Sequence, residues 1–288
     1  MLPSFPTEAA ARHEDGFLNS ADHLRLYWQR FTPERPKATV LVLHGGGDHC
    51  GRYPGITAAL VGARFQVALM DFRGHGQSDG RRWHVDGFGD YLHDLDAFVA
   101  KLSQDGIAGD RLFVVGHSQG GLIAALWAVG HQRLLSGAVL SSPYFRLAMK
   151  PPVAKVLAAR MIGRVVPWLP VSAGLDVAKL TSDPELQRWT DRDPLYGRST
   201  TPRWFEESSR AQLEALRRAG EIEVPLLVLA GGADEVADAT AARAFVNAAR
   251  SGDKRLVVYD GFRHELFNEV RRAEPIGEAV AWLEAHVR

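Results

Sequence analysis

Ser118 is the side chain in this sequence best placed to act as a nucleophile. It lies at the centre of the pentapeptide 116–120, GHSQG, which has the form G-x-S-x-G. The apolar run RLFVV precedes the motif and an alanine-rich segment follows it, which is the strand–turn–helix context of a nucleophile elbow. The alternative is an ordinary glycine-rich turn between a strand and a helix, but this context favours catalysis.

A serine hydroxyl needs a base, and two histidines follow late enough in the chain to supply one. In proteins that carry this elbow the chain order is serine, then a carboxylate, then histidine. His264 follows the apolar run RLVVY and a four-residue turn, whereas His286 lies two residues from the C-terminus. We therefore predict that His264 is the general base.

The acid that orients this base is expected in the loop after the apolar run VPLLVL. Asp234, Glu235 and Asp238 all lie there. Asp234 is nearest to the end of the strand and is our prediction for the orienting acid. Asp238 is better suited to accept hydrogen bonds at the start of the following helix, as an N-cap residue.

Three consecutive glycines, 45–47, follow the apolar run ATVLVL and His44. Glycines at this place let backbone N–H groups approach a developing oxyanion. We predict that the N–H groups of Gly46 and Gln119 form the oxyanion hole. A phosphate-binding loop is disfavoured because neither G-x-G-x-x-G nor G-x-x-x-x-G-K-[ST] occurs. Since no H-E-x-x-H motif or cysteine pair accompanies His44 and His49, we expect no metal and no cofactor.

These residues must be positioned by elements that alternate between strand and helix. The apolar patterns predict a hairpin over 16–19 and 24–31, strands over 38–43, 65–70, 111–115, 138–140, 226–229 and 255–259, and helices over 91–102, 120–129, about 237–250, and 275–286. Such alternation is typical of an α/β protein whose mostly parallel sheet is covered by helices on both faces.

The alternation stops between about residues 143 and 210, where prolines are dense and no strand pattern occurs. We interpret residues 144–205 as a helical cap inserted into a core made of residues 1–143 and 206–288. A helical wheel over 153–166 places Leu157, Met161 and Ile162 on one apolar arc. The pattern favours a cap helix packed on the core, with arginines reaching water. The alternative is an apolar mouth in which these three residues bind the acyl chain and the cap touches lipid surfaces transiently.

The composition limits the partners and the compartment. Lys plus Arg and Asp plus Glu both number 34, so no net charge attracts nucleic acid. Cys50 is the only cysteine, which excludes an internal disulfide and fits a reducing compartment. The longest apolar stretch has ten residues, whereas a membrane span needs about 20. Together with the absence of a signal-peptide pattern, this predicts a cytoplasmic protein whose oligomeric state the sequence leaves open.

Five motifs resemble those of the α/β-hydrolase superfamily, specifically the monoacylglycerol lipase and lysophospholipase-like group in its bacterial form. They are HGGGDHCGRY (44–53), DFRGHGQSDG (71–80), GHSQGG (116–121), GGAD (231–234) and HELFNE (264–269). The resemblance extends over nearly the whole chain from about Asp15 and implies a helical cap. One departure is Gln119, because methionine commonly follows the serine in that group.

The motifs and the resemblance imply a serine-dependent carboxylic ester hydrolase that forms an acyl-enzyme on single-acyl-chain lipid esters. Monoacylglycerols and lysophospholipids are the expected small-molecule substrates. One alternative is an aminopeptidase-like amidase, which needs a carboxylate near the cap to hold an ammonium group. Asp183, Glu185, Asp191 and Asp193 lie in that segment. A second alternative is a small-molecule receptor without catalytic activity. The intact set of serine, histidine and aspartate disfavours this alternative.

Overall fold

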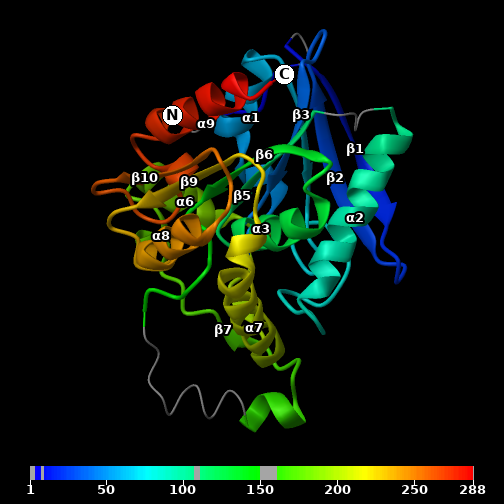
Figure 1. The fold of residues 1–288 in the computed structure, drawn as a ribbon. Helices are drawn as coiled ribbons and strands as arrows, with labels where there is room; N and C mark the ends of the chain where they lie inside the picture. Colours follow the sequence, from blue (N-terminus) through cyan, green and yellow to red (C-terminus); the bar gives the residue numbers. More distant parts are fainter. Residues whose placement is uncertain (1–3, 8–9, 107–110, 150–160, 288) are drawn as a thin grey trace.

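The computed structural model describes residues 4–7, 10–106, 111–149 and 161–287. An eight-stranded sheet in the order β1-β2-β4-β3-β5-β6-β9-β10 runs through its centre (Figure 1). The pairs β1–β2 and β2–β4 are antiparallel, and the other neighbours are parallel. The strands are β1 (Arg12–Asn19), β2 (Arg25–Thr32), β3 (Ala38–Leu43), β4 (Phe65–Met70), β5 (Leu112–His117), β6 (Leu135–Ser141), β9 (Leu226–Gly231) and β10 (Lys254–Tyr259).

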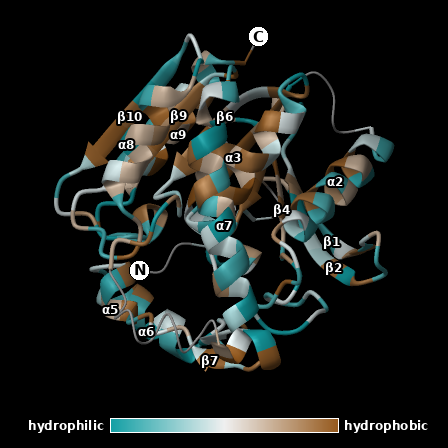
Figure 2. Cartoon of the chain, turned by 60° about the horizontal axis from the view of Figure 1, so that its bottom comes forward, coloured by the Kyte–Doolittle hydropathy of each residue, from teal (hydrophilic) through white to brown (hydrophobic). Residues whose placement is uncertain are grey.

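Helices cover both faces of this sheet, which confirms the predicted α/β architecture. Helices α1 (Pro54–Gly62) and α9 (Ala273–Ala285) pack on one face, and α2 (Gly89–Gln104), α3 (Gln119–His131) and α8 (Ala239–Ala248) pack on the other. Figure 2 shows α3 as a largely hydrophobic helix between the sheet and its neighbours. Ten of its thirteen residues are buried.

The central strands are apolar along their whole length because both of their faces are covered. All six residues of β3 and of β4 are buried. Val40 and Val42 enter the layer with α1 and α9, whereas Leu41 and Leu43 enter the layer with α2 and α3. This division follows from the alternation of side chains along a strand, and it explains why both strands were predictable as continuous apolar runs.

The segment predicted as a cap contains short elements beyond one end of the sheet. These are β7 (Val171–Ser172), α5 (Val177–Leu180), α6 (Pro184–Arg192) and β8 (Ser199–Thr200), followed by α7 (Pro202–Arg218) (Figures 1 and 2). Two findings differ from the sequence interpretation. Strands β7 and β8 form a small antiparallel pair where no strand was expected. Helix α7 runs through the predicted boundary at 205/206, and it packs against α3 of the core. In the part of the chain that the structure describes, no helix is long and apolar enough to cross a membrane.

Candidate active site

Ser118 stands on a sharp turn between β5 and α3. Its backbone has φ +53° and ψ −116°, a strained conformation for a residue with a side chain. A Cβ atom on Gly116 would lie 2.4 Å from the carbonyl oxygen of Gly120, and one on Gly120 would lie 2.4 Å from the carbonyl oxygen of Leu43. The two glycines of the motif are therefore required by the close approach of α3 to the ends of β5 and β3.

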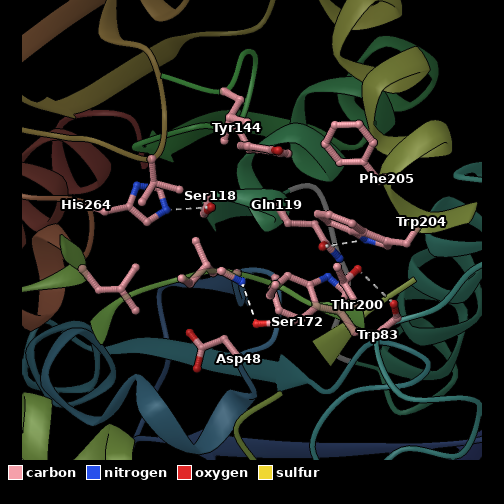
Figure 3. A pocket seen from close by; sticks show the side chains of 18 of the residues that line it. Asp48, Trp83, Ser118, Gln119, Tyr144, Ser172, Thr200, Trp204, Phe205 and His264 are labelled. Atoms are coloured by element: carbon pink, nitrogen blue, oxygen red, sulfur yellow. Dashed lines mark hydrogen bonds between the residues drawn. The ribbon is translucent and has the colours of Figure 1, made fainter. Parts of the chain in front are cut away.

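The loops after β9 and β10 bring Asp234 and His264 to this turn. The Nε2 atom of His264 lies 2.8 Å from Oγ of Ser118 (Figure 3). Its Nδ1 atom lies 2.8 Å from Oδ2 of Asp234. Oδ1 of Asp234 accepts hydrogen bonds from the backbone N–H groups of Val236 and Ala237. A carboxylate can only accept, so Nδ1 carries the proton and Nε2 is free to accept from the serine hydroxyl.

The surroundings set the charge states of these groups. Burial lowers the pKa of His264, but the adjacent Asp234 carboxylate, together with Glu265 and Asp48, holds that pKa above its usual 6.5. Burial raises the pKa of Asp234, yet His264 and the two backbone N–H groups lower it below its usual value. His117, whose ring centroid lies 4.9 Å from that of His264, behaves differently. Burial lowers the pKa of His117 to about 3, so this neighbouring ring remains neutral.

The glycine loop after β3 lies directly against the serine. A Cβ on Gly45 would lie 3.3 Å from Cβ of Ser118, and the N–H group of Gly45 already donates to the hydroxyl of Tyr53. The backbone of Gly46 packs beside the side chain of Gln119, because a Cβ there would lie 2.9 Å from its Oε1 atom. The two residues predicted to form the oxyanion hole are therefore neighbours next to Ser118.

The side chain of Gln119 connects the elbow to the helix α7. Its Oε1 atom accepts a hydrogen bond of 3.1 Å from Nε1 of Trp204, as Figure 3 shows. Trp204 in turn packs edge-on against Trp83, with ring centroids 5.1 Å apart. The polar side chain that replaces the group's methionine is thus fixed by an indole N–H donor of α7.

A cavity of about 480 Å³ opens above Ser118 and His264. Its wall is mostly apolar and aromatic; the side chains that extend it away from the serine include Tyr144, Leu147, Met149, Val171, Pro202 and Phe205. Figure 3 shows Tyr144 and Phe205 on one side of the line from His264 to Gln119 and Asp48 on the other. The cavity therefore has an aromatic side, with Tyr144 and Phe205, and a mixed side, where Asp48 lies with Trp83, Ser172 and Thr200.

The residues expected to bind the acyl chain in the alternative interpretation are placed differently. Leu157 lies outside the described residues. Met161 and Ile162 are 69% and 41% exposed, and the described lining of the cavity does not contain them. The apolar wall comes instead from α7, β7 and the loop after β6. The substrate contact predicted for these residues remains a prediction.

Sequence reasoning missed a charged cluster on the side of the cavity where Asp48 lies. Arg52 is fully buried and lies between two carboxylates, with its Nε atom 2.7 Å from Asp48 and its Nη2 atom 3.2 Å from Glu265. Its guanidinium also lies over the rings of Trp189 and Tyr196 from the cap segment. Asp48 and Glu265 both line the cavity. The signal was present in HGGGDHCGRY and HELFNE, but spacing along the chain gives no indication that these motifs meet.

The cap carboxylates considered for an amidase make other contacts. Asp193 pairs with His49 at 2.8 Å, Asp183 pairs with Arg272 at 2.9 Å, and Asp191 lies 3.7 Å from Arg198. None of these three, nor Glu185, belongs to the described lining of the cavity. A search of the described residues finds no group of three or more His, Cys, Asp or Glu side chains arranged to hold a metal ion.

The helix-covered parallel sheet, with a serine on a tight turn after a central strand, defines the class of α/β hydrolases. Residues 34–271 match the family model described as serine aminopeptidase, S33, and the chain belongs to that family.

Similar proteins indicate one group within the class of α/β hydrolases. The chain is 33% identical to the human monoglyceride lipase over 88% of this chain and 84% of that one. It is 30% identical to phospholipase YtpA of Bacillus subtilis over 88% of this chain and 98% of that one. Among solved structures, the monoacylglycerol lipase of Paleococcus ferrophilus superposes with a TM-score of 0.82 at 31% identity, covering 91% of this chain and 99% of that one. The predicted membership of the monoacylglycerol lipase-like group of serine ester hydrolases is confirmed.

Proposed function

We propose that this protein hydrolyses single-acyl-chain lipid esters, with Ser118 as nucleophile, His264 as general base and Asp234 as the acid that orients it. The observation that carries the proposal is the continuous chain of hydrogen bonds from Oγ of Ser118 through His264 to Asp234, each 2.8 Å long. This series of hydrogen bonds ends at Ser118, which lines a mostly apolar cavity. A weak nucleophile, a correctly oriented base and an apolar binding space are together what ester hydrolysis requires.

The proposed reaction has two stages. Oγ of Ser118 attacks the ester carbonyl carbon while Nε2 of His264 takes the hydroxyl proton, and Asp234 stabilises the imidazolium that forms. The N–H groups of Gly46 and Gln119 donate to the developing oxyanion. The C–O bond then breaks, His264 gives its proton to the leaving alcohol, and the acyl group stays on Ser118. Water enters next and attacks the acyl carbon while His264 takes one of its protons. The bond between the acyl carbon and Oγ then breaks, His264 returns the proton to Oγ of Ser118, and the carboxylic acid leaves.

The walls of the cavity support a lipid ester rather than an aminoacyl amide. An aminopeptidase must hold an ammonium group on the acyl side of the scissile bond. Most of the described residues that line the cavity are apolar or aromatic, including Leu147, Val171 and Phe205. Asp48 lies across the cavity from Tyr144 and Phe205 (Figure 3), and Glu265, which also lines the cavity, is joined to Asp48 through Arg52. Relatives named monoglyceride lipase and phospholipase support the same choice.

A second part of the proposal concerns lipid surfaces. The segment following residue 160 exposes several large apolar side chains to solvent: Met161, Ile162, Val165, Trp168 and Leu169. Apolar side chains flanked by Arg164 favour contact with the surface of a lipid aggregate. We propose that this segment touches such surfaces while substrate enters the cavity.

The direct test is hydrolysis of monoacylglycerols and 4-nitrophenyl esters by the wild-type protein and by Ser118→Ala. The variant is expected to lose more than 99% of kcat, because members of such an arrangement contribute several factors of ten. Its melting temperature should stay within a few degrees of wild type, since the substitution removes one oxygen atom. A variant that keeps more than a few per cent of kcat would refute the assignment of Ser118.

A further inference from the structure

The side of the cavity where Asp48 lies suggests how the protein selects the alcohol part of its substrate. During catalysis His264 gives its proton to the leaving alcohol, so the alcohol lies on the His264 side of the scissile bond. Glu265 follows His264 directly, and Arg52 joins it to Asp48. Both carboxylates line the cavity. The head group of a glycerol ester must therefore enter a space bordered by Asp48 and Glu265.

This space has a negative balance of charge. Asp48 and Glu265 contribute two negative charges and Arg52 contributes one positive charge, so the three side chains together carry one negative charge. The cation is inaccessible to a ligand, because Arg52 is fully buried and rings of Trp189 and Tyr196 lie 4.9 Å and 5.2 Å from its guanidinium carbon. No Lys or Arg belongs to the part of the lining that the structure describes. An anionic head group would meet carboxylates and no available counter-charge.

Arg198 is a positively charged residue near the cavity and must be considered as a partner for an anionic head group. It borders a smaller pocket that shares Ser172 and Tyr196 with the main cavity. Its guanidinium donates to the backbone oxygens of Thr190 and Asp191. These bonds hold the guanidinium toward the cap backbone, and the carboxylate of Asp191 lies 3.7 Å from its Nη1 atom.

We propose that Asp48 and Glu265 make the protein select lipid esters of uncharged, hydroxyl-bearing alcohols and reject those whose alcohol carries a phosphate. The proposal rests on the proposed ester hydrolase function, and it names the substrate class within it. Asp48 already accepts from Tyr53 and pairs with Arg52, and Glu265 accepts from Arg52 and Asn268. The lone pairs that remain on these carboxylate oxygens can accept hydrogen bonds from alcohol hydroxyls. The same oxygens repel a phosphate, and repulsion at the short distances of a cavity is only weakly screened by salt.

The test compares two substrates with the same twelve-carbon acyl chain below their aggregation concentration. These are 1-lauroylglycerol and 1-lauroylglycerol 3-phosphate, at pH 8, where the phosphate is close to dianionic. The wild-type protein should favour the neutral ester in kcat/KM by about 100-fold or more. Glu265→Gln keeps the shape of the side chain and removes its negative charge. It should lower the ratio of the two kcat/KM values about 10-fold. Asp48→Asn should act in the same direction. Glu206→Gln, an exposed carboxylate on α7, is the matched control and should leave the ratio unchanged.

Binding measurements separate this proposal from the hydrolase function itself. The non-hydrolysable ethers 1-dodecylglycerol and its 3-phosphate can be titrated calorimetrically into the wild-type and Glu265→Gln proteins, with the neutral dimethyl ester of that phosphate as a control for size. Among these three ligands, only the 3-phosphate is expected to bind weakly to the wild-type protein. Equal binding of phosphate and alcohol, or rejection of the neutral dimethyl ester as well, would overturn it. A protein that discriminates between the ethers but hydrolyses no ester would instead refute the proposed function.

Discussion

The substitution Asp234→Asn removes the orienting charge and preserves the size of the side chain. In the structure, one oxygen of Asp234 accepts from the N–H groups of Val236 and Ala237 at 2.8 and 2.9 Å, and the other lies 2.8 Å from Nδ1 of His264. The asparagine oxygen is expected to keep the two backbone donors, because an NH₂ group cannot accept from them. The NH₂ group then faces Nδ1 of His264, which must become an acceptor.

That exchange moves the imidazole proton to Nε2, where it points at the hydroxyl of Ser118. The ring then no longer accepts the serine proton. Enforcing the wrong tautomer in a Ser-His-Asp enzyme lowers kcat about 10⁴-fold, which corresponds to about 5.4 kcal/mol of activation free energy. The fold should tolerate the change, because the backbone hydrogen bonds remain. We expect a loss of about 1 kcal/mol in the free energy of unfolding, the value of one hydrogen bond.

The assay is steady-state hydrolysis of 4-nitrophenyl butyrate at pH 8, combined with thermal unfolding. Asp238→Asn is the matched control, because Asp238 N-caps α8 through Thr240 and pairs with Arg146. This control should keep its kcat and lose at most about 1 kcal/mol of stability. The reasoning fails if Asp234→Asn retains more than a tenth of the wild-type kcat, or if Asp238→Asn is the more impaired enzyme.

Three further experiments probe the base, the cap, and the contact between the cap and the loop after β3. Log kcat/KM should rise with pH through one ionisation above 6.5, because only neutral His264 accepts a proton and the carboxylates of Asp234, Glu265 and Asp48 together hold its pKa above that value despite burial. A profile flat from pH 5 to 8 would contradict this. Met161→Glu should raise KM several-fold for a twelve-carbon ester presented as an aggregate and leave a monomeric four-carbon ester unaffected, whereas equal effects would indicate a packing role. Burial lowers the pKa of His49, but Asp193 and other carboxylates raise it above 6.5, so this pair stabilises the fold at low pH and loses that contribution as pH rises through the raised pKa. Asp193→Asn should therefore lower the free energy of unfolding by about 1 kcal/mol more at pH 6 than at pH 9; an equal loss at both pH values would show that charge is not involved.

The secondary structure that the sequence predicted well is the buried sheet. The ranges of β3 and β4 agree at both ends with the predicted 38–43 and 65–70, because strands covered on both faces are apolar at every position. Helix α1 was missed. It is apolar around most of its circumference and therefore lacks the amphipathic period by which a helix is recognised. Strands β7 and β8, two residues each, are too short to produce an alternating pattern.

The boundary of the cap was also beyond the reach of sequence patterns. Prolines and the absence of strands marked residues 144–205, yet α7 continues from Pro202 to Arg218. Its first turns carry Trp204 and Phe205 into the cavity wall, and its later turns pack on the core. A single amphipathic helix that serves both parts shows no break in periodicity at the position where one part meets the other.

Ser118, Asp234 and His264 could be predicted from sequence patterns because each follows a strand of the sheet. Parallel strands end at a common edge, so residues placed just after them converge without further information. Tertiary structure alone decided the charged cluster, because Arg52 meets Glu265 across 213 positions and His49 meets Asp193 across 144. Such pairs arise where a cap and two loops fold over one another, and each partner taken alone is an ordinary polar residue of a loop. The physical reason is that a strand end is a local property of the chain, whereas burial of a charge depends on everything packed around it.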